Sequence, residues 1–108
     1  MTKILYNPTR VVYRLYMECL PGTNCYWNER FGEWGYTIYS ARGHYQGVSE
    51  NACVVDVMLP KGDVEEHVWV HKCAREYCEQ FNQEAVLITK QEVEASFVGP
   101  GVTSNADA

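Results

Sequence analysis

The sequence predicts an α+β fold: a ferredoxin-like antiparallel sheet of four to five strands that carries one long helix in its C-terminal half. Three observations predict it. Residues 10–19 place an apolar side chain at every second position, as a half-buried strand does. Residues 52–59 form a second and more apolar strand pattern, and residues 64–81 repeat apolar side chains at helical spacing.

Length and composition indicate one small globular domain. The chain has 108 residues, of which 46% are hydrophobic and 21% are charged, as in an ordinary folded domain. Eight tyrosines bring the aromatic share to 13%, and tyrosine suits recognition surfaces as well as cores. We expect a single domain over residues 1–98 and a disordered tail over the small, polar residues 99–108.

The charge balance and the cysteines narrow the class of protein. A net charge of −5 argues against non-specific nucleic-acid binding, which needs a basic surface, but leaves room for a local basic pocket. The sequence shows neither a membrane-span pattern nor a signal-peptide pattern, so a cytoplasmic protein is expected. Five cysteines, an odd number, favour reduced core thiols over a disulfide framework.

Turn residues separate the first strands. Pro21-Gly22 ends the strand over 10–19, and residues 23–35 form either a short helix of one or two turns or an ordered loop. The next strand covers 36–39. The following glycines indicate a bulge or a close backbone approach, and Ser49-Glu50-Asn51 is expected to form the turn before the strand over 52–59.

Capping residues define the long helix. Asp63 is a suitable N-cap residue with Glu66 three positions later, which predicts a helix from Val64 to Phe81. Asn82 suits the left-handed residue that follows a helix. A fourth strand is expected over 85–89, and a further strand, or its continuation, over 92–98.

One long helix cannot cover a four-stranded sheet. Either the segment over 23–35 covers the remainder or a second subunit does. Val12 and Tyr16 place apolar side chains on the other face of the first strand, which favours a homodimer.

Residues 36–47 hold the strongest candidate binding site. Arg42 offers a planar guanidinium for phosphate or carboxylate, and His44 can donate, accept or titrate near neutral pH. Such a cluster of aromatic and basic residues suits a small anionic ligand such as a nucleotide, whereas the alternative is an ordinary twisted hairpin. The full candidate set is Trp34, Tyr36, Tyr39, Arg42, His44, Tyr45, Gln46 and Glu84.

Two further groups of residues are candidates for chemistry. His67 and His71 are four residues apart and share one helix face, as metal-binding pairs do, but His-Glu-x-x-His and Cys-x-x-Cys patterns are absent. We therefore expect no metal or other cofactor. Glu84 is either a general base in an apolar site or a residue that hydrogen-bonds the neighbouring strand. The sequence has no Gly-x-Ser-x-Gly nucleophile motif.

Three short segments carry a family resemblance. Gly43-His-Tyr-Gln-Gly47, then Ser49-Glu50, then Phe81-Asn-Gln-Glu-Ala-Val-Leu87 resemble, in this order, a group of short uncharacterised bacterial and phage-encoded proteins. The resemblance covers roughly residues 10 to 98. Some members of that group carry a signal peptide and this sequence does not, which fits a cytoplasmic, phage-borne protein.

The aromatic and basic cluster, in a chain without a recognisable catalytic set, favours a non-enzymatic binding protein. By analogy with other short acidic phage proteins, the resemblance implies a phage counter-defence factor that sequesters a nucleotide-like ligand or blocks a host protein. Two alternatives remain open. One is a small dimeric enzyme that uses His44 and Glu84 as acid and base. The other is a protein-interaction module that binds a partner through its exposed sheet face.

Overall fold

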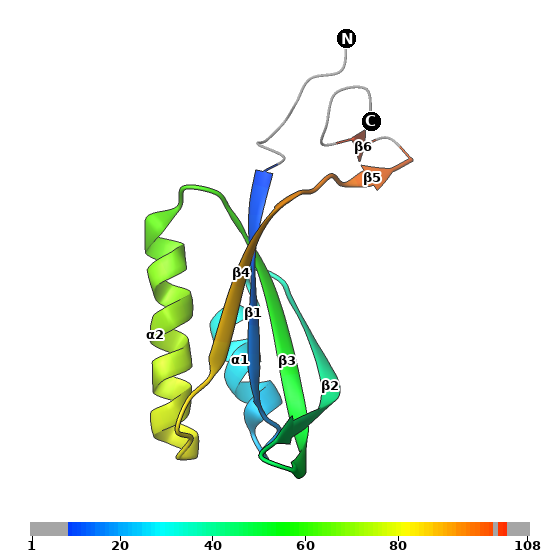
Figure 1. Cartoon of the computed structure of the whole chain (residues 1–108). Helices are drawn as coiled ribbons and strands as arrows, with labels where there is room; N and C mark the ends of the chain where they lie inside the picture. The colour runs from blue at the N-terminus through cyan, green and yellow to red at the C-terminus, as the bar shows by residue number, and fades with distance from the viewer. Residues whose placement is uncertain (1–8, 101, 104–108) are drawn as a thin grey trace.

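A computed structural model describes residues 9–100 and 102–103, with Tyr45, Val102 and Thr103 described by their backbone alone. The elements in chain order are β1 (Thr9–Glu18), α1 (Thr23–Phe31), β2 (Tyr36–Tyr45), β3 (Val48–Pro60), α2 (Val64–Phe81), β4 (Leu87–Glu94), β5 (Val98–Gly99) and β6 (Val102–Thr103) (Figure 1).

The main sheet has four strands in the order β2-β3-β1-β4, and each neighbouring pair is antiparallel. The first strand of the sequence therefore lies inside the sheet, while β2 and β4 form its edges. Together with the order β1-α1-β2-β3-α2-β4, this is the ferredoxin-like topology. The predicted fold class is confirmed.

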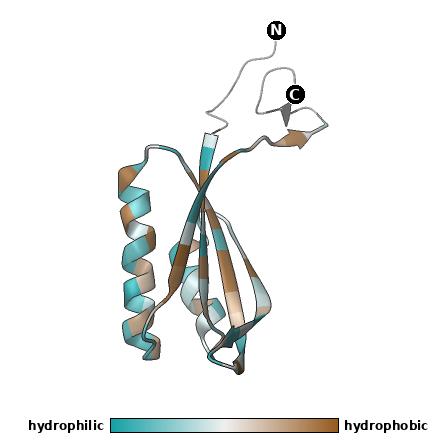
Figure 2. Cartoon of the chain, in the orientation of Figure 1, coloured by the Kyte–Doolittle hydropathy of each residue, from teal (hydrophilic) through white to brown (hydrophobic). Residues whose placement is uncertain are grey.

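Both helices pack on the same face of the sheet (Figure 1). The segment over 23–35 thus contains the short helix of the two predicted alternatives, and this helix covers part of the face that α2 leaves free. Hydrophobic segments run along β3 and β4 in Figure 2. The core joins alternate residues of β1 and β3 to both helices: Val11, Tyr13, Leu15, Met17, Tyr26, Trp27, Phe31, Cys53, Val55, Val57, Leu59, Val70, Cys73, Ala74 and Tyr77.

Helix α2 begins and ends where its capping residues predict. The Asp63 carboxylate accepts a hydrogen bond from the Glu66 backbone N–H at 3.4 Å, and Asn82 adopts the left-handed conformation with φ 52° and ψ 49°. The side chains of Val70, Cys73, Ala74 and Tyr77 are buried. This is the predicted apolar stripe, which ends in the half-buried Phe81.

The β2–β3 hairpin turns earlier than predicted. Both of its strands are longer than the sequence suggests, and Tyr45 pairs with Val48 across a two-residue loop of Gln46 and Gly47. Both loop residues have positive φ, 50° and 80°, as a type I′ turn requires. The expected turn at 49–51 is part of β3. Because β1 ends opposite Ala52, residues 48–51 of β3 pair only with β2 and are exposed to solvent.

One further expectation needs correction: strand β4 starts two residues later than predicted. It continues as one strand to Glu94, which is one of the two predicted alternatives. Beyond it, β5 and β6 pair in a two-stranded ladder in which Gly99 is opposite Val102. Residues 101 and 104–108 lie outside the described residues.

The five cysteines are free thiols in the structure: Cys53 and Cys73 are buried, Cys78 is half-buried, and Cys19 and Cys25 are exposed. Burial raises the pKa of Cys73 to about 11, which keeps it protonated. Burial and the neighbouring Cys19 thiol raise the pKa of Cys53 to about 12. Cys19 itself, predicted inside the first strand, lies one residue beyond β1 and is exposed.

Candidate functional site

A pocket of about 600 Å³ lies between the N-terminal half of α2 and the sheet. Its residues come from the beginning of β1, the β3–α2 turn, α2 and the middle of β4. They are Val11, Tyr13, Lys61, Gly62, Val64, His67, Val68, His71, Lys72, Arg75, Lys90 and Glu92. This volume falls within the range of small-molecule binding sites.

The pleat of β4 explains why charged side chains reach this pocket. Ile88, which packs against the core, is opposite Leu15, and the next residues on that face are Lys90 opposite Tyr13 and Glu92 opposite Val11. Alternate residues of a strand share one face. The helix-facing side of β4 therefore changes from apolar to charged halfway along the strand.

A second stripe on α2 forms the opposite wall. Val64, Val68, His71 and Arg75 follow one another at intervals of three or four residues and so lie on one side of the helix. Val64 and Val68 are 70% and 61% exposed. Since both also line the pocket, they offer it an apolar surface that no described residue covers.

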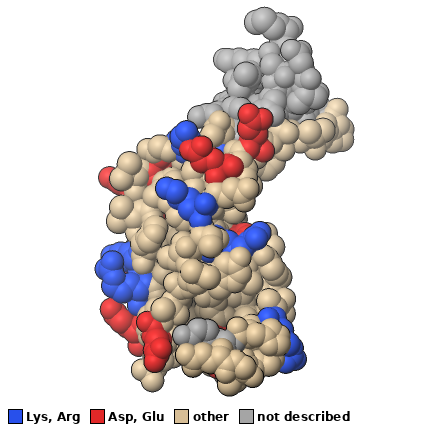
Figure 3. Space-filling model, viewed as in Figure 1, with Lys and Arg blue, Asp and Glu red and all other residues tan. Residues whose placement is uncertain are grey.

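The pocket is basic although the chain is acidic. Four of its residues are cationic and one is a carboxylate, which gives a charge of +3 with neutral histidines, against −5 for the chain. In the part of the chain that the structure describes, Arg75 and Lys90 form no salt bridge. Figure 3 shows Lys and Arg on both sides of the region between α2 and β4. Such an arrangement attracts anions.

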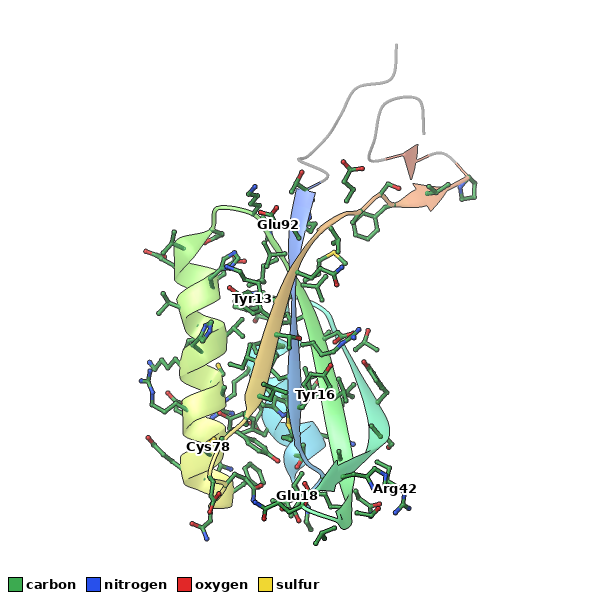
Figure 4. The ribbon with its side chains drawn as sticks, in the orientation of Figure 1. Tyr13, Tyr16, Glu18, Arg42, Cys78 and Glu92 are labelled. Atoms are coloured by element: carbon green, nitrogen blue, oxygen red, sulfur yellow. The ribbon has the colours of Figure 1, made fainter. Side chains whose placement is uncertain are left out.

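Tyr13 and His67 form a hydrogen-bonded floor. The Tyr13 hydroxyl is 2.6 Å from Nδ1 of His67, and Nε2 of the same ring is 3.2 Å from the Pro60 carbonyl. A carbonyl only accepts, so Nε2 carries a proton, and in the neutral ring Nδ1 accepts from the tyrosine. Burial raises the pKa of Tyr13. Figure 4 shows this side chain between β1 and α2.

The histidine pair is held by hydrogen bonds rather than arranged around a metal. Both ring nitrogens of His67 are engaged, and Nδ1 of His71 lies 3.1 Å from the His67 carbonyl. Among the described residues, no group of three His, Cys, Asp or Glu side chains could hold a metal ion. The two rings thus lie at the border between the buried and the exposed side of α2, where their nitrogens bond to Tyr13 and to backbone carbonyls.

The structure distributes the predicted hairpin residues over different environments. Trp34 and Tyr36 pack against the core beside α1, and the Tyr36 hydroxyl donates to Asn28 at 3.3 Å. Tyr39 is 40% exposed and pairs with Val54 on the face without helices. Because side chains alternate along β2, the pleat separates Tyr39 from Tyr36 and Arg42.

The rest of the predicted set lies at the end of the hairpin and after α2. Arg42 donates to the Ser49 hydroxyl across the hairpin at 2.8 Å, and Figure 4 shows it near the turn, away from Tyr13 and Glu92. His44 is exposed, Gln46 forms the turn, and the side chain of Tyr45 lies outside the described residues. Gly43 makes no close backbone approach, since a Cβ there would meet the Glu50 side chain at an ordinary 3.5 Å.

His44 and Glu84 lie at opposite edges of the sheet. His44 is on the edge strand β2, and Glu84 lies in the connection that leads to β4, the other edge strand. Both are exposed, and neither lines the pocket. The acid–base pairing that the enzyme hypothesis needs is not formed by this arrangement.

Sequence reasoning did not identify the basic pocket. A signal for half of it was present, because Ile88, Lys90 and Glu92 alternate along one strand and so share a face. The other half, the stripe from Val64 to Arg75, has helical spacing next to the buried stripe. The sequence alone does not show that these two surfaces face each other.

The comparisons with known proteins support the fold. No family model matches the chain, and no curated protein matches it. A solved structure, that of CPII, a nitrogen regulatory PII-like protein from Thiomonas intermedia K12 bound to ADP, AMP and bicarbonate, is similar with a TM-score of 0.54 and 13% identity. The similarity covers 87% of this chain and 97% of that one. In residues 9–100 no helix is long and apolar enough to cross a membrane.

Proposed function

We propose that this protein is a non-enzymatic binding protein for a small nucleotide-like anion, and that the basic pocket between α2 and β4 is its binding site. The observation that carries the proposal is the excess of cationic side chains around an apolar and aromatic floor in an acidic chain. The similar CPII structure was solved with ADP, AMP and bicarbonate, which supports ligands of this class.

The two kinds of surface in the pocket suit the two parts of a nucleotide. Lys90, from β4, and Arg75, from α2, form no salt bridge among the described residues and can hold a phosphate from both walls. Val64 and Val68 offer apolar surface for a ring. A phosphate within 4 Å of one such cation gains about 1 kcal/mol in water-like surroundings and about 4 kcal/mol at an effective dielectric constant of 20.

Calorimetric titration of the protein with ADP, AMP, adenosine and inorganic phosphate tests the proposal. We expect ADP to bind more tightly than adenosine, and Lys90→Ala and Arg75→Ala each to weaken ADP binding by roughly tenfold, because each removes one phosphate partner. If the protein binds none of the four compounds, or binds ADP and adenosine equally well, the proposal is wrong.

Arg42→Ala is the matched comparison, since it also removes one exposed cation. If the pocket is the site, ADP affinity changes little, because Arg42 contacts Ser49 at the far hairpin. The hairpin site predicted from the sequence remains the competing hypothesis. It requires the opposite result, with Arg42→Ala abolishing binding while Lys90→Ala has no effect.

The face of the sheet that carries neither helix supports the homodimer that the sequence favours. Tyr16, Met58 and Leu87 expose 36%, 43% and 62% of their surface there, and Tyr16 is paired with Leu87. Light scattering on Tyr16→Ser tests it: a dimer that becomes a monomer supports the face as the contact. Blocking of a host protein, and with it a role in phage counter-defence, rests on the sequence resemblance.

A further inference from the structure

The Lys61–Glu92 ion pair crosses one end of the pocket. Lys61 lies in the turn between β3 and α2, and its Nζ is 2.8 Å from Oε1 of Glu92 on β4. Both side chains are more than half exposed, and both line the pocket. The pair thus connects the helix wall to the strand wall, and Glu92 is the carboxylate among the lining residues (Figure 4).

The turn that presents Lys61 is well anchored. Its neighbour Pro60 accepts the Nε2–H of His67 at 3.2 Å, which ties the turn to the first part of α2. Gly62 takes φ 96°, a left-handed conformation that glycine adopts without steric cost. The backbone of Lys61 is therefore held beside the pocket by contacts that do not involve Glu92.

The other cations differ from Lys61 in their partners. Lys72 lies 3.9 Å from Glu76 on its own helix, whereas Arg75 and Lys90 have no such partner in the described chain. The Glu92 carboxylate hydrogen-bonds Lys61 and lies near Lys90, and the pKa of this carboxyl is lowered by both. A carboxylate of the protein thus occupies one of the positions that an incoming anion would use.

We infer that Glu92 is an internal competitor for the anion site: a bound anion takes Lys61 from Glu92, and this exchange sets both the affinity and the charge that the pocket accepts. The inference rests on the proposed function. An exposed ion pair contributes little because water screens it, so the exchange is easy to drive. A phosphate with two negative charges displaces the carboxylate more readily than a monoanion such as bicarbonate.

Inward-facing charge also protects an edge strand from pairing with other chains, and β4 is an edge strand. That role depends on charge along the strand. It requires neither the bond to Lys61 nor any effect on ligand affinity, so the two explanations give different results in a binding experiment.

Titration of ADP into wild type, Glu92→Gln and Glu94→Gln tests the inference. Glu92→Gln removes the competitor and keeps the shape, so we expect ADP to bind roughly three- to tenfold more tightly, the effect of one nearby charge. Glu94→Gln makes the same charge change two residues along β4, outside the pocket lining, and should change affinity by about twofold or less. Equal effects of the two substitutions would overturn the inference.

Lys61→Ala in both backgrounds separates exchange from general electrostatics. If Glu92 holds Lys61 in the free protein, removing Lys61 weakens ADP binding more in the Glu92→Gln protein than in wild type. Equal losses would mean that Glu92 acts through net charge alone, and the exchange would be wrong. If wild type binds ADP and Glu92→Gln does not change the affinity, this inference alone is wrong. If neither wild type nor any variant binds ADP, the proposed function is wrong as well.

Discussion

The two ends of helix α2 meet the sheet in different ways. The C-terminal half, together with α1, closes over an aromatic core in which Trp27 stacks on Phe31 and Tyr77 at centroid distances of 5.2 and 5.4 Å. The N-terminal half faces Lys90 and Glu92 of β4 across an open pocket. The same helix therefore seals one half of the layer and leaves the other half accessible.

Side-chain size and charge on the facing elements account for the difference. In the sealed half, α1 supplies large rings that fill the space between α2 and the sheet. In the open half no second helix of residues 9–100 lies beside α2, and the inward positions of β4 are charged, so close packing would bury unpaired charge at high cost. Stability should therefore depend mainly on the aromatic half, and ligand binding on the open half.

Replacing a tryptophan in each half gives the largest expected difference. Trp27 is fully buried and its indole N–H donates to the Met17 sulfur at 2.9 Å, so Trp27→Ala should lower the free energy of unfolding by about 3–5 kcal/mol. Trp69 on α2 is half-buried, and Trp69→Ala should cost about 1–2 kcal/mol. Urea denaturation followed by far-ultraviolet circular dichroism measures both. Equal losses would contradict the division into two halves.

Two valines within one turn of α2 test the same division into an open and a sealed half. Val70 is fully buried and Val68 is 61% exposed in the pocket wall. We expect Val70→Ala to cost about 2 kcal/mol and Val68→Ala less than about 0.5 kcal/mol. The helix propensity change is identical in the two variants, so denaturation midpoints compare burial alone. A large loss in Val68→Ala would show that the pocket wall is closed in solution.

The two tyrosine hydroxyls allow a finer comparison. The Tyr77 hydroxyl donates to the Glu18 carbonyl at 3.0 Å and is 3.0 Å from the Thr23 hydroxyl. Tyr77→Phe removes both hydrogen bonds, while the Thr23 hydroxyl keeps the one it accepts from the Leu20 N–H. We expect a loss of about 1–3 kcal/mol. Tyr13→Phe removes a bond to the half-exposed His67 and should cost about 1 kcal/mol or less, because water can replace the hydroxyl. Thermal unfolding of both variants provides the measurement.

The smallest expected effect is a pH dependence in the open half. The pKa of Glu92 lies below its usual 4.5 because Lys61 hydrogen-bonds its charged form. A carboxyl whose pKa is lowered by folding stabilises the folded state at neutral pH, and this contribution is lost as pH falls from 4.5 through the folded value. The stability difference between wild type and Glu92→Gln should therefore be small at pH 7 and disappear in acid. A difference that grows on acidification would contradict the ion pair.

Local chemistry made α2 predictable from the sequence. Its limits depend on an N-cap carboxylate and a left-handed asparagine, both of which are signals within a few residues. Helix α1 lacks such a signal. Gly22 precedes it in a left-handed conformation, and no side chain caps its first N–H groups, so a helix and a loop were both consistent with the sequence.

The hairpin and the pocket show the limit of pattern reasoning. The polar residues 49–51 resemble a turn, yet they continue β3 beyond the end of β1, where neither face is buried. The aromatic and basic cluster on β2 resembles a site, but the pleat divides it between two faces. The pocket needs α2 to lie over β4, and that placement follows from the order of strands in the sheet, which no local pattern contains.

The position of β1 inside the sheet also has a consequence for how the protein folds. Its partners are distant in the sequence: Arg10 pairs with Pro60, and Thr9 with Glu94. When paired strands are far apart in the sequence, the entropy cost of closing the long loop between them comes before the strands gain contacts. This slows folding relative to helical proteins of the same size. The pocket joins Val11 and Tyr13 of β1 to Lys90 and Glu92 of β4. The recovery of ligand binding during refolding would therefore report when β4, the last strand of the main sheet, pairs with β1.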